Sequence, residues 1–356
     1  MSEKLIKPDV FDCREKVMLV GPGYKYDFIE RNLKQSKKVC FTKTYGTVLT
    51  FYSWLKKRIK SKYTENSYQA GRKFREELRE ISSNMLVKVL EGRIDLKGSP
   101  SNPWLKDFYQ GIDCYYISFP DLLGINGAWQ WFSKGIKFPG LSCKLHPFYG
   151  TYFPTRFEHL ELFDDWLKNT GLQIKKAVDI GTGCGVLVFY MLKYGIINIH
   201  ATDINPNAIY SLKEDLQYHN YTEQVKLFEG KFFAGAKDKY DLVVFNPPWI
   251  PGKPKTVIDK GIFYEKSFWK EFFDEASSHM EAGGRLVILF SDLALVEGIN
   301  HMHPVKEQLR SDERFRVLNV LTKHKKTSKN DEERKAFRQT NGEKDETIEL
   351  WDIQFD

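Results

Sequence analysis

The chain has 356 residues, which is room for two domains, and a formal net charge of +7 with a pI near 8.9. Its proportions of 42% hydrophobic and 28% charged residues are those of a globular protein. No run of about 18 apolar residues is present, which excludes a membrane-spanning helix. The cysteines form no CxxC pair and the N-terminus lacks the apolar core of a signal peptide, so we expect reduced thiols and a cytoplasmic protein.

The first part of the chain predicts a separate N-terminal domain, residues 1–150, of mixed or mainly helical structure. Residues 45–59 and 67–90 have the apolar spacing of amphipathic helices. Residues 104–153 are rich in aromatic residues, glycine and proline, and they predict loops and short strands without a clear order.

Basic residues in this N-terminal domain alternate with aromatic ones. The pattern suits RNA binding through phosphate contacts and base stacking, so a protein, RNA or DNA substrate is an expected partner. An amphipathic helix with a solvated basic face explains the same pattern, and the net positive charge is small for this length. The residues are Lys34, Lys37, Lys38, Lys43, Lys56, Lys57, Arg58, Lys60 and Lys62, with Tyr45, Tyr52, Trp54 and Tyr63.

From residue 151 onward the pattern predicts an α/β domain, residues 151–356. A helix is expected over residues 157–169, and five short apolar runs then alternate with helical stretches, which indicates βαβ units and a parallel sheet. The five expected strands are residues 177–180, 199–202, 225–228, 242–245 and 285–290. Two further runs, 315–321 and 347–355, predict an antiparallel pair joined by the polar segment 324–346, expected to be a mobile loop.

A glycine-rich turn follows the first of these strands. Gly181, Gly183 and Gly185 permit unusual backbone angles and let a ligand approach the main chain. The spacing is G-x-G-x-G, which lacks the third glycine of the dinucleotide fingerprint. Asp203 at the end of the second strand can accept hydrogen bonds from ribose hydroxyls, and Asp179 can balance the positive charge of a bound sulfonium or amino group. A tight turn without a ligand is the alternative.

The fourth strand ends in the sequence Asn246-Pro247-Pro248-Trp249. Proline cannot continue a central ladder, so the chain leaves the sheet here, at the edge where parallel sheets bind ligands. The Asn246 side-chain oxygen and the Pro247 carbonyl can each accept one N–H of a planar nitrogen, and the prolines hold these acceptors in place. Trp249 can stack on the planar group. A proline turn with a packed tryptophan is the alternative reading.

At these residues the chain resembles the class I methyltransferases, and within them the branch with an (N/D)-P-P-(Y/F/W) motif, which includes release-factor glutamine methyltransferases and nucleobase amino-methyltransferases. The resemblance implies a Rossmann-like fold with a seven-stranded, mostly parallel sheet whose last strand runs antiparallel, and S-adenosyl-L-methionine as cofactor. It also implies that the N-terminal domain selects the substrate. The cofactor residues it implies are Thr155, Asp179, Gly181, Thr182, Gly183, Gly185, Asp203, Ile204, Phe232 and Asn246, and the acceptor nitrogen is expected at Asn246, Pro247, Pro248 and Trp249.

The chain departs from this family after the third strand, where the family often has Gly-Asp. Here Lys231 follows Gly230 and cannot accept a hydrogen bond from adenine. Glu229 or a main-chain carbonyl is then expected to do so, or adenine is held by packing against Phe232. Upstream, residues 150–156 resemble a Pro-Arg-Pro segment of the glutamine-modifying group but lack its second proline.

The resulting prediction is an N-methyltransferase that acts on a planar nitrogen, either a protein glutamine amide or a nucleobase amine of a macromolecule. Two alternatives are a small-molecule N- or S-methyltransferase and a non-catalytic scaffold that retains the fold; the intact proline motif argues against the scaffold. His146, His301 and His303 lack further ligands at metal spacing, so no metal site is predicted. The sequence predicts no oligomeric state.

Overall fold

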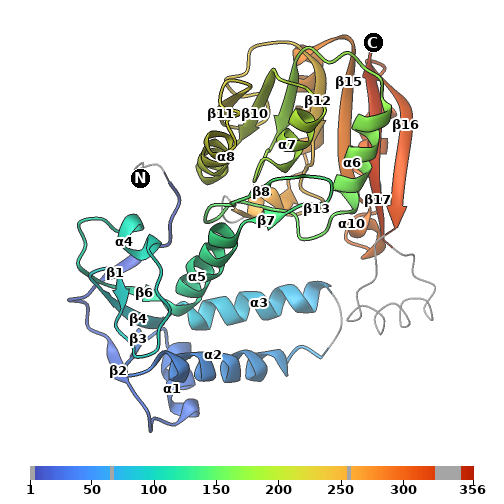
Figure 1. Ribbon diagram of the computed structural model, residues 1–356. Helices are drawn as coiled ribbons and strands as arrows, with labels where there is room; N and C mark the ends of the chain where they lie inside the picture. Colours follow the sequence, from blue (N-terminus) through green and yellow to red (C-terminus); the bar gives the residue numbers. More distant parts are fainter. Residues whose placement is uncertain (1–4, 65–67, 255–257, 325–345) are drawn as a thin grey trace. The chain divides into compact units, whose positions relative to one another are not determined.

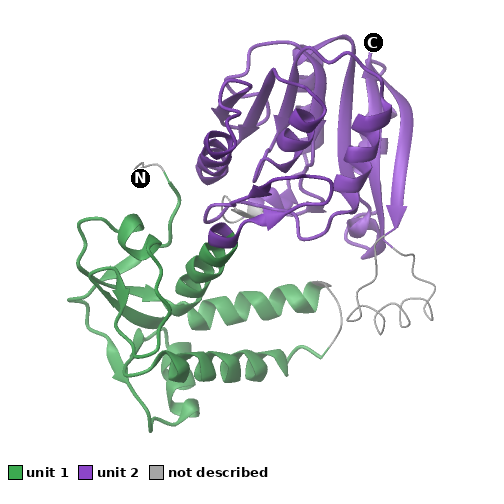
Figure 2. Cartoon of the chain, viewed as in Figure 1, with its two compact units in different colours: residues 1–131 green, residues 132–356 purple. Residues whose placement is uncertain are grey.

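The structure is a computed structural model that describes residues 5–64, 68–254, 258–324 and 346–356. The chain divides into two compact units, Met1–Trp131 and Phe132–Asp356 (Figure 2). Residues 132–150, assigned from the sequence to the N-terminal domain, lie in the second unit. Among the described residues, none of the helices combines the length and apolarity that crossing a bilayer requires.

The first unit contains a six-stranded mixed sheet with the order β1-β6-β4-β3-β2, and β5 pairs with β4. The neighbours β2, β3 and β4 run parallel, whereas β6 is antiparallel to both β4 and β1. The strands are β1 (Val10–Asp12), β2 (Met18–Val20), β3 (Val39–Phe41), β4 (Met85–Leu90), β5 (Arg93–Ile94) and β6 (Cys114–Ser118). The helices are α1 (Tyr26–Lys34), α2 (Tyr45–Lys60), α3 (Tyr68–Ser82), α4 (Trp104–Phe108) and α5 (Phe119–Lys134), whose last turn crosses the unit boundary.

The single helix predicted over residues 67–90 is wrong in its last third, residues 83–90. The helix α3 ends at Ser82 and the chain enters β4 at Met85. Apolar residues in β4 continue the helical spacing by coincidence, but the β-branched Val87 and Val89 favour an extended backbone. Both valines are fully buried in the sheet, so tertiary burial decides the conformation.

The second unit contains a seven-stranded sheet with the order β11-β10-β9-β12-β15-β17-β16 (Figure 1). The five strands from β11 to β15 run parallel, and β17 is antiparallel to both of its neighbours. The strands are β9 (Ala177–Ile180), β10 (Ile199–Asp203), β11 (Val225–Glu229), β12 (Tyr240–Phe245), β15 (Met280–Ser291), β16 (Phe315–His324) and β17 (Thr347–Phe355). The predicted sheet is confirmed; the predicted loop between the last two strands falls on residues 325–345, outside the described residues.

Helices cover both faces of this sheet because successive side chains of a strand point to opposite sides. In β12, Val244 packs in the layer of Phe163 and Leu212, while its neighbour Val243 packs in the layer of Phe272. The first layer holds α6 (Glu158–Asn169), α7 (Val186–Lys193) and α8 (Pro206–Tyr218), and the second holds α9 (Phe268–His279) and α11 (Pro304–Leu309). Shorter elements are β7 (Ile136–Lys137), β8 (Lys144–Leu145), β13 (Ile250–Pro251), η1 (Ile258–Gly261), β14 (Phe263–Tyr264) and α10 (Leu293–Val296).

The segment that follows β8 is tied to α8 by main-chain contacts. The N–H of His146 donates to the Asp215 carboxylate at 2.8 Å, and the N–H of Phe148 donates to the Ser211 hydroxyl at 3.0 Å. These bonds bring Gly150 and the residues after it to the ends of β9 and β10. Residues 144–152 therefore belong structurally to the unit whose site they border.

Candidate active site

Three left-handed glycines shape the turn between β9 and α7. Their φ angles are 65° at Gly181, 53° at Gly183 and 78° at Gly185, a region that residues with a Cβ rarely adopt. At Gly183 a Cβ would lie 2.9 Å from the main-chain oxygen of Tyr152, the same oxygen that accepts the N–H of Cys184 at 3.0 Å. The turn is therefore held against the segment before α6 in one shape.

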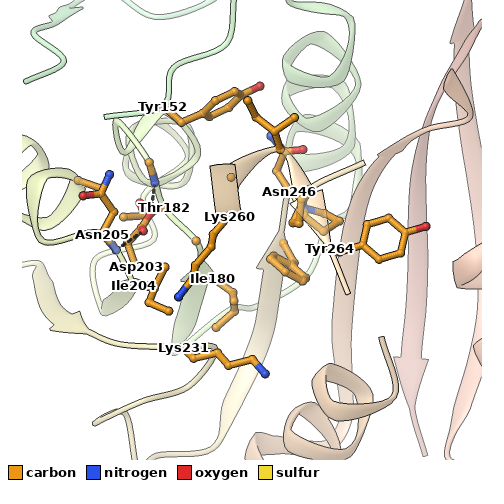
Figure 3. Close-up of a pocket in the computed structure, with 18 of the residues that line it drawn as sticks. Tyr152, Ile180, Thr182, Asp203, Ile204, Asn205, Lys231, Asn246, Lys260 and Tyr264 are labelled. Atoms are coloured by element: carbon orange, nitrogen blue, oxygen red, sulfur yellow. Dashed lines mark hydrogen bonds between the residues drawn. The ribbon is translucent and has the colours of Figure 1, made fainter. Parts of the chain in front are cut away.

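Two carboxylates lie beside this turn. Asp179 is fully buried, and one of its oxygens accepts the Thr182 hydroxyl at 2.7 Å. Its other oxygen, Oδ1, is buried with no hydrogen-bond partner among the described residues. Asp203 accepts the N–H of Gly183 at 2.9 Å and the N–H of Asn205 at 2.8 Å (Figure 3). Burial raises the pKa of Asp179 to about 7 and also raises the pKa of Asp203.

A cavity of about 490 Å³ opens at the carboxyl ends of β9, β10 and β12. Most of the site residues predicted from the sequence line it: Gly181, Thr182, Gly183, Asp203, Ile204, Phe232, Asn246, Pro247, Pro248 and Trp249. Three predicted residues do not line it, namely Thr155, Asp179 and Gly185. Thr155 is exposed at a bend of the chain after Pro154, Asp179 lies buried behind Thr182, and Gly185 is the N-cap of α7.

The proline motif forms one wall of the cavity. Pro247 and Pro248 are buried, and the side-chain oxygen of Asn246 is buried without a hydrogen-bond partner in the described part of the chain. Trp249 donates its indole N–H to the carbonyl of Leu289 at 3.2 Å. Its ring also meets the buried His159 ring edge-on at 5.7 Å between centroids, so the indole is fixed from behind.

His159 contacts Trp249 as a neutral ring. Burial lowers the pKa of His159 to about 4, and neither ring nitrogen has a hydrogen-bond partner among the described residues. An uncharged imidazole packs against an indole edge as an aromatic contact rather than as a cation. The packing behind the Trp249 ring is therefore uncharged.

The residues after β11 show where Lys231 lies, at the position where the resembled family often has an aspartate. Lys231 forms an ion pair with Glu271 of α9, and its ammonium lies 4.7 Å from the centre of the Phe232 ring. Phe232 is buried among aromatic residues and still borders the cavity, whereas Glu229 is exposed and is not among the lining residues. Phe232 is therefore better placed than Glu229 to hold a planar ring in the cavity.

Sequence reasoning missed several lining residues that come from distant segments. Tyr152, Lys260 and Tyr264 border the cavity, and the Lys260 side chain points into it (Figure 3). Lys260 and Gly261 belong to a stretch that loosely resembles the loop after the proline motif in the glutamine-modifying group, which was the available signal for them. Tyr152 had none, because hydrogen bonds to the glycine turn rather than a pattern of its own place it there.

Comparison with known proteins identifies this arrangement. Residues 161–319 match the model of the methyltransferase small domain family. Over these residues the chain holds a class I S-adenosylmethionine-dependent methyltransferase domain. The match spans the sheet strands from β9 to the first half of β16, with the glycine turn, Asp203 and the proline motif inside it.

Relatives of the methyltransferase differ in what their names say they modify. A Methanocaldococcus jannaschii protein named as a protein N5-glutamine methyltransferase is 29% identical over 191 residues, 51% of this chain and 92% of the relative. Ribosomal RNA small subunit methyltransferase C of Psychromonas ingrahamii is 28% identical over 151 residues, 42% of this chain and only 40% of the relative. The solved ribosomal protein L11 methylase of Lactobacillus delbrueckii subsp. bulgaricus aligns over 62% of this chain and 90% of its own, with 16% identity and a TM-score of 0.40.

The site of the methyltransferase fits its methyl donor in two respects. The unpartnered Oδ1 of Asp179 is a buried acceptor beside the glycine turn, suited to the positive charge of the donor. The Asp203 carboxylate lies at the end of β10 and accepts two N–H groups. A carboxylate has more lone pairs than these two hydrogen bonds use. Ribose hydroxyls can therefore use the remaining acceptor capacity.

Proposed function

We propose that the enzyme transfers a methyl group to a planar nitrogen of a macromolecule, either a glutamine amide or a nucleobase amine. The observation that carries this proposal is the side-chain oxygen of Asn246, which is buried at the cavity wall without a partner among the described residues. A buried acceptor without a donor is costly. An N–H group of the acceptor substrate would satisfy it.

The cofactor is proposed to lie along the carboxyl ends of β9 and β10. The methionine part would meet the glycine turn, with Asp179 and Thr182 behind it, and the ribose hydroxyls would bind Asp203. Ile204 and Phe232 would hold the adenine between apolar surfaces. The proposed cofactor residues are Asp179, Gly181, Thr182, Gly183, Gly185, Asp203, Ile204, Phe232 and Asn246. Thr155 is left out because it is exposed as well as absent from the cavity lining, whereas Asp179 and Gly185 are buried beside the glycine turn.

Positioning is the main contribution of the protein to the proposed reaction. S-adenosylmethionine supplies an electrophilic methyl group on a sulfonium. The Asn246 oxygen and the Pro247 carbonyl would each accept an N–H of the substrate, which turns the nitrogen lone pair toward that methyl group. A bond from nitrogen to carbon forms as the carbon–sulfur bond breaks, and the nitrogen then releases one proton to solvent. No strong base is required for this sequence.

A macromolecular substrate is favoured over a small molecule by the relatives. Two relatives that match this chain are named for glutamine residues of proteins and for ribosomal RNA, and both of these polymers present a planar nitrogen. The two substrates share the acceptor chemistry that the Asn246 wall suits, so the motif alone does not separate them.

The proposal is tested by transfer of tritiated methyl groups into cell extract treated separately with protease and nuclease. Asn246→Ala should still bind S-adenosylmethionine by calorimetry, with at most a modest loss of affinity because Asn246 also borders the proposed cofactor site, while transfer at saturating cofactor falls at least about a hundredfold, as on removal of an oriented acceptor at a reacting centre. Asn246→Asp, which keeps an acceptor oxygen, should retain part of the activity. Unchanged transfer by Asn246→Ala would refute the planar-nitrogen proposal.

A further inference from the structure

The net positive charge of the enzyme lies in one of its two units. Residues 1–131 contain 23 Lys and Arg against 15 Asp and Glu, a net charge of +8, whereas residues 132–356 contain 31 against 32, a net charge of −1. The unit that holds the cavity is therefore close to neutral. A basic surface confined to one unit is the electrostatic pattern expected of a domain that meets a polyanion.

Within the first unit the charge is concentrated in one stretch of sequence. Residues 31–64 contain ten Lys and Arg and no acidic residue. Four of the ten pair with carboxylates that lie outside residues 31–64, and six have no carboxylate partner in the described part of this unit. The paired residues are Lys34, Lys38, Arg58 and Lys62, and the others are Arg31, Lys37, Lys43, Lys56, Lys57 and Lys60.

The last turn of α2 brings three of these six together. The apolar face of α2 is buried through Leu55 and Ile59, while Lys56, Lys57 and Lys60 are exposed. Lys56 and Lys60 are one turn apart, about 6 Å along the helix axis, which is close to two successive phosphate steps of one strand at about 3.4 Å per step. Lysines at a helix C-terminus also stabilise the helix through its dipole, but that effect does not explain the absence of acidic residues from 31 to 64.

We propose that Lys56, Lys57 and Lys60 bind the phosphodiester backbone of a nucleic acid. This proposal rests on the proposed function, of which it selects the nucleobase-amine branch. A nucleic acid is favoured over an acidic protein because residues 31–64 hold ten basic residues and no acidic one, and a phosphodiester backbone carries charge of the opposite sign only. The surface alone does not distinguish RNA from DNA, since both carry the same backbone charge.

The test measures binding by the full chain, without cofactor, to labelled RNA and DNA of about 20 nucleotides, long enough to exceed common single-strand site sizes. The test variant is Lys56→Gln, Lys57→Gln and Lys60→Gln together. The matched control carries Lys137→Gln, Lys168→Gln and Lys213→Gln, three exposed lysines of the second unit. A third variant replaces the same three α2 lysines with arginine, which keeps the charge.

Binding should weaken with salt, and the α2 variant should lose about tenfold or more in affinity, with a logarithmic salt slope shallower by about two. The control and the arginine variant should bind as the unmodified enzyme does. Tighter binding to RNA or to DNA would identify which nucleic acid the lysines bind, and either result supports the proposal. Absence of binding at about 50 mM salt, equal loss in the control, or equally tight binding of a glutamate-rich peptide would overturn it.

This experiment separates the two proposals from each other. Asn246→Ala is expected to bind nucleic acid normally because Asn246 lies at the cavity of the second unit. If oligonucleotides fail to bind while Asn246→Ala abolishes methylation of a protein, the nucleic-acid proposal is refuted and the planar-nitrogen proposal stands.

Discussion

Asp179 and Thr182 are joined by a hydrogen bond of 2.7 Å that leaves the second oxygen of the Asp179 carboxylate buried and without a partner among the described residues. Burial is the main reason that the pKa of this carboxyl rises to about 7. The neighbouring Asp203 raises it further, and the Thr182 hydroxyl opposes the rise. The group therefore changes charge near neutral pH in the folded protein.

Cofactor affinity should accordingly depend on pH through Asp179. The folded pKa lies above the unfolded value of about 3.9, so the stability contribution of the protonated form is complete below pH 4 and is lost as pH rises toward about 7. A positively charged cofactor favours the ionised form. We expect the Kd for S-adenosylmethionine by calorimetry to fall up to about tenfold per pH unit between pH 5 and 7 and then level off. Asp179→Asn should bind weakly with a flatter profile; an unchanged slope would contradict this assignment.

Gly185 offers a test of how tightly the turn packs on α8. Gly185 has φ 78°, and an added Cβ would lie 2.3 Å from a methyl carbon of Leu212. Gly195 has nearly the same φ, 79°, but nothing lies within 4 Å of its added Cβ. Gly195→Ala should cost about 1 kcal/mol of unfolding free energy for the backbone alone, and Gly185→Ala about 1–3 kcal/mol more. Thermal and urea unfolding measure both, and equal losses would show that Leu212 yields freely.

Trp249→Phe keeps an aromatic ring at the cavity wall but removes the N–H that binds Leu289. We expect a loss of about 1 kcal/mol in unfolding free energy because the Leu289 carbonyl loses its donor. We also expect a several-fold higher KM for the acceptor, with cofactor affinity unchanged, because the ring is no longer held in one orientation. Steady-state kinetics at saturating cofactor measures the KM for the acceptor. A change in cofactor affinity alone would contradict the placement of Trp249 beside the acceptor.

Arg156 joins the segment before α6 to the start of β17. Its Nη1 donates to both carboxylate oxygens of Glu346 at 2.8 and 3.0 Å, and Glu346 also accepts the Ser291 hydroxyl at 2.7 Å. The Glu346 side chain is only 2% exposed. Arg156→Ala leaves this carboxylate buried without its cation and should cost about 3–5 kcal/mol in urea unfolding.

The second variant of this pair tests the cause of that loss. Adding Glu346→Gln to Arg156→Ala removes the uncompensated charge and should recover part of the stability. If the double variant is less stable than Arg156→Ala by the full cost of a further mutation, the two residues are not coupled.

The catalytic unit was predictable from sequence because its signals are local. Each of the five predicted parallel strands is a short, mainly apolar run in the sequence, and Asp203 and Asn246 stand directly after two of these runs. The carboxyl ends of parallel strands meet at one edge, so residues at those positions come together without knowledge of packing. Ten of the thirteen predicted site residues line the cavity for this reason.

The remaining features depend on contacts between distant segments. The strand β4 was predicted as helix because the burial that selects its extended form comes from β3 and β6. Tyr152 reaches the site through hydrogen bonds of its segment to α8 and to the glycine turn. Thr155, three residues later, shares the segment but is exposed and does not line the cavity. The family resemblance of residues 150–156 therefore predicted the correct segment but not the residue that borders the cavity.

The position of β17 has a consequence for the order in which the enzyme is made. This strand lies between β15 and β16 and pairs with both. During synthesis, β15 and β16 leave the ribosome before their shared partner β17, which is translated after both of them. The catalytic sheet can acquire its final strand order only after residues 347–355 emerge. The nascent chain must therefore keep the apolar edge of β15 unpaired until then, and that edge is the stretch on which a chaperone would be most useful.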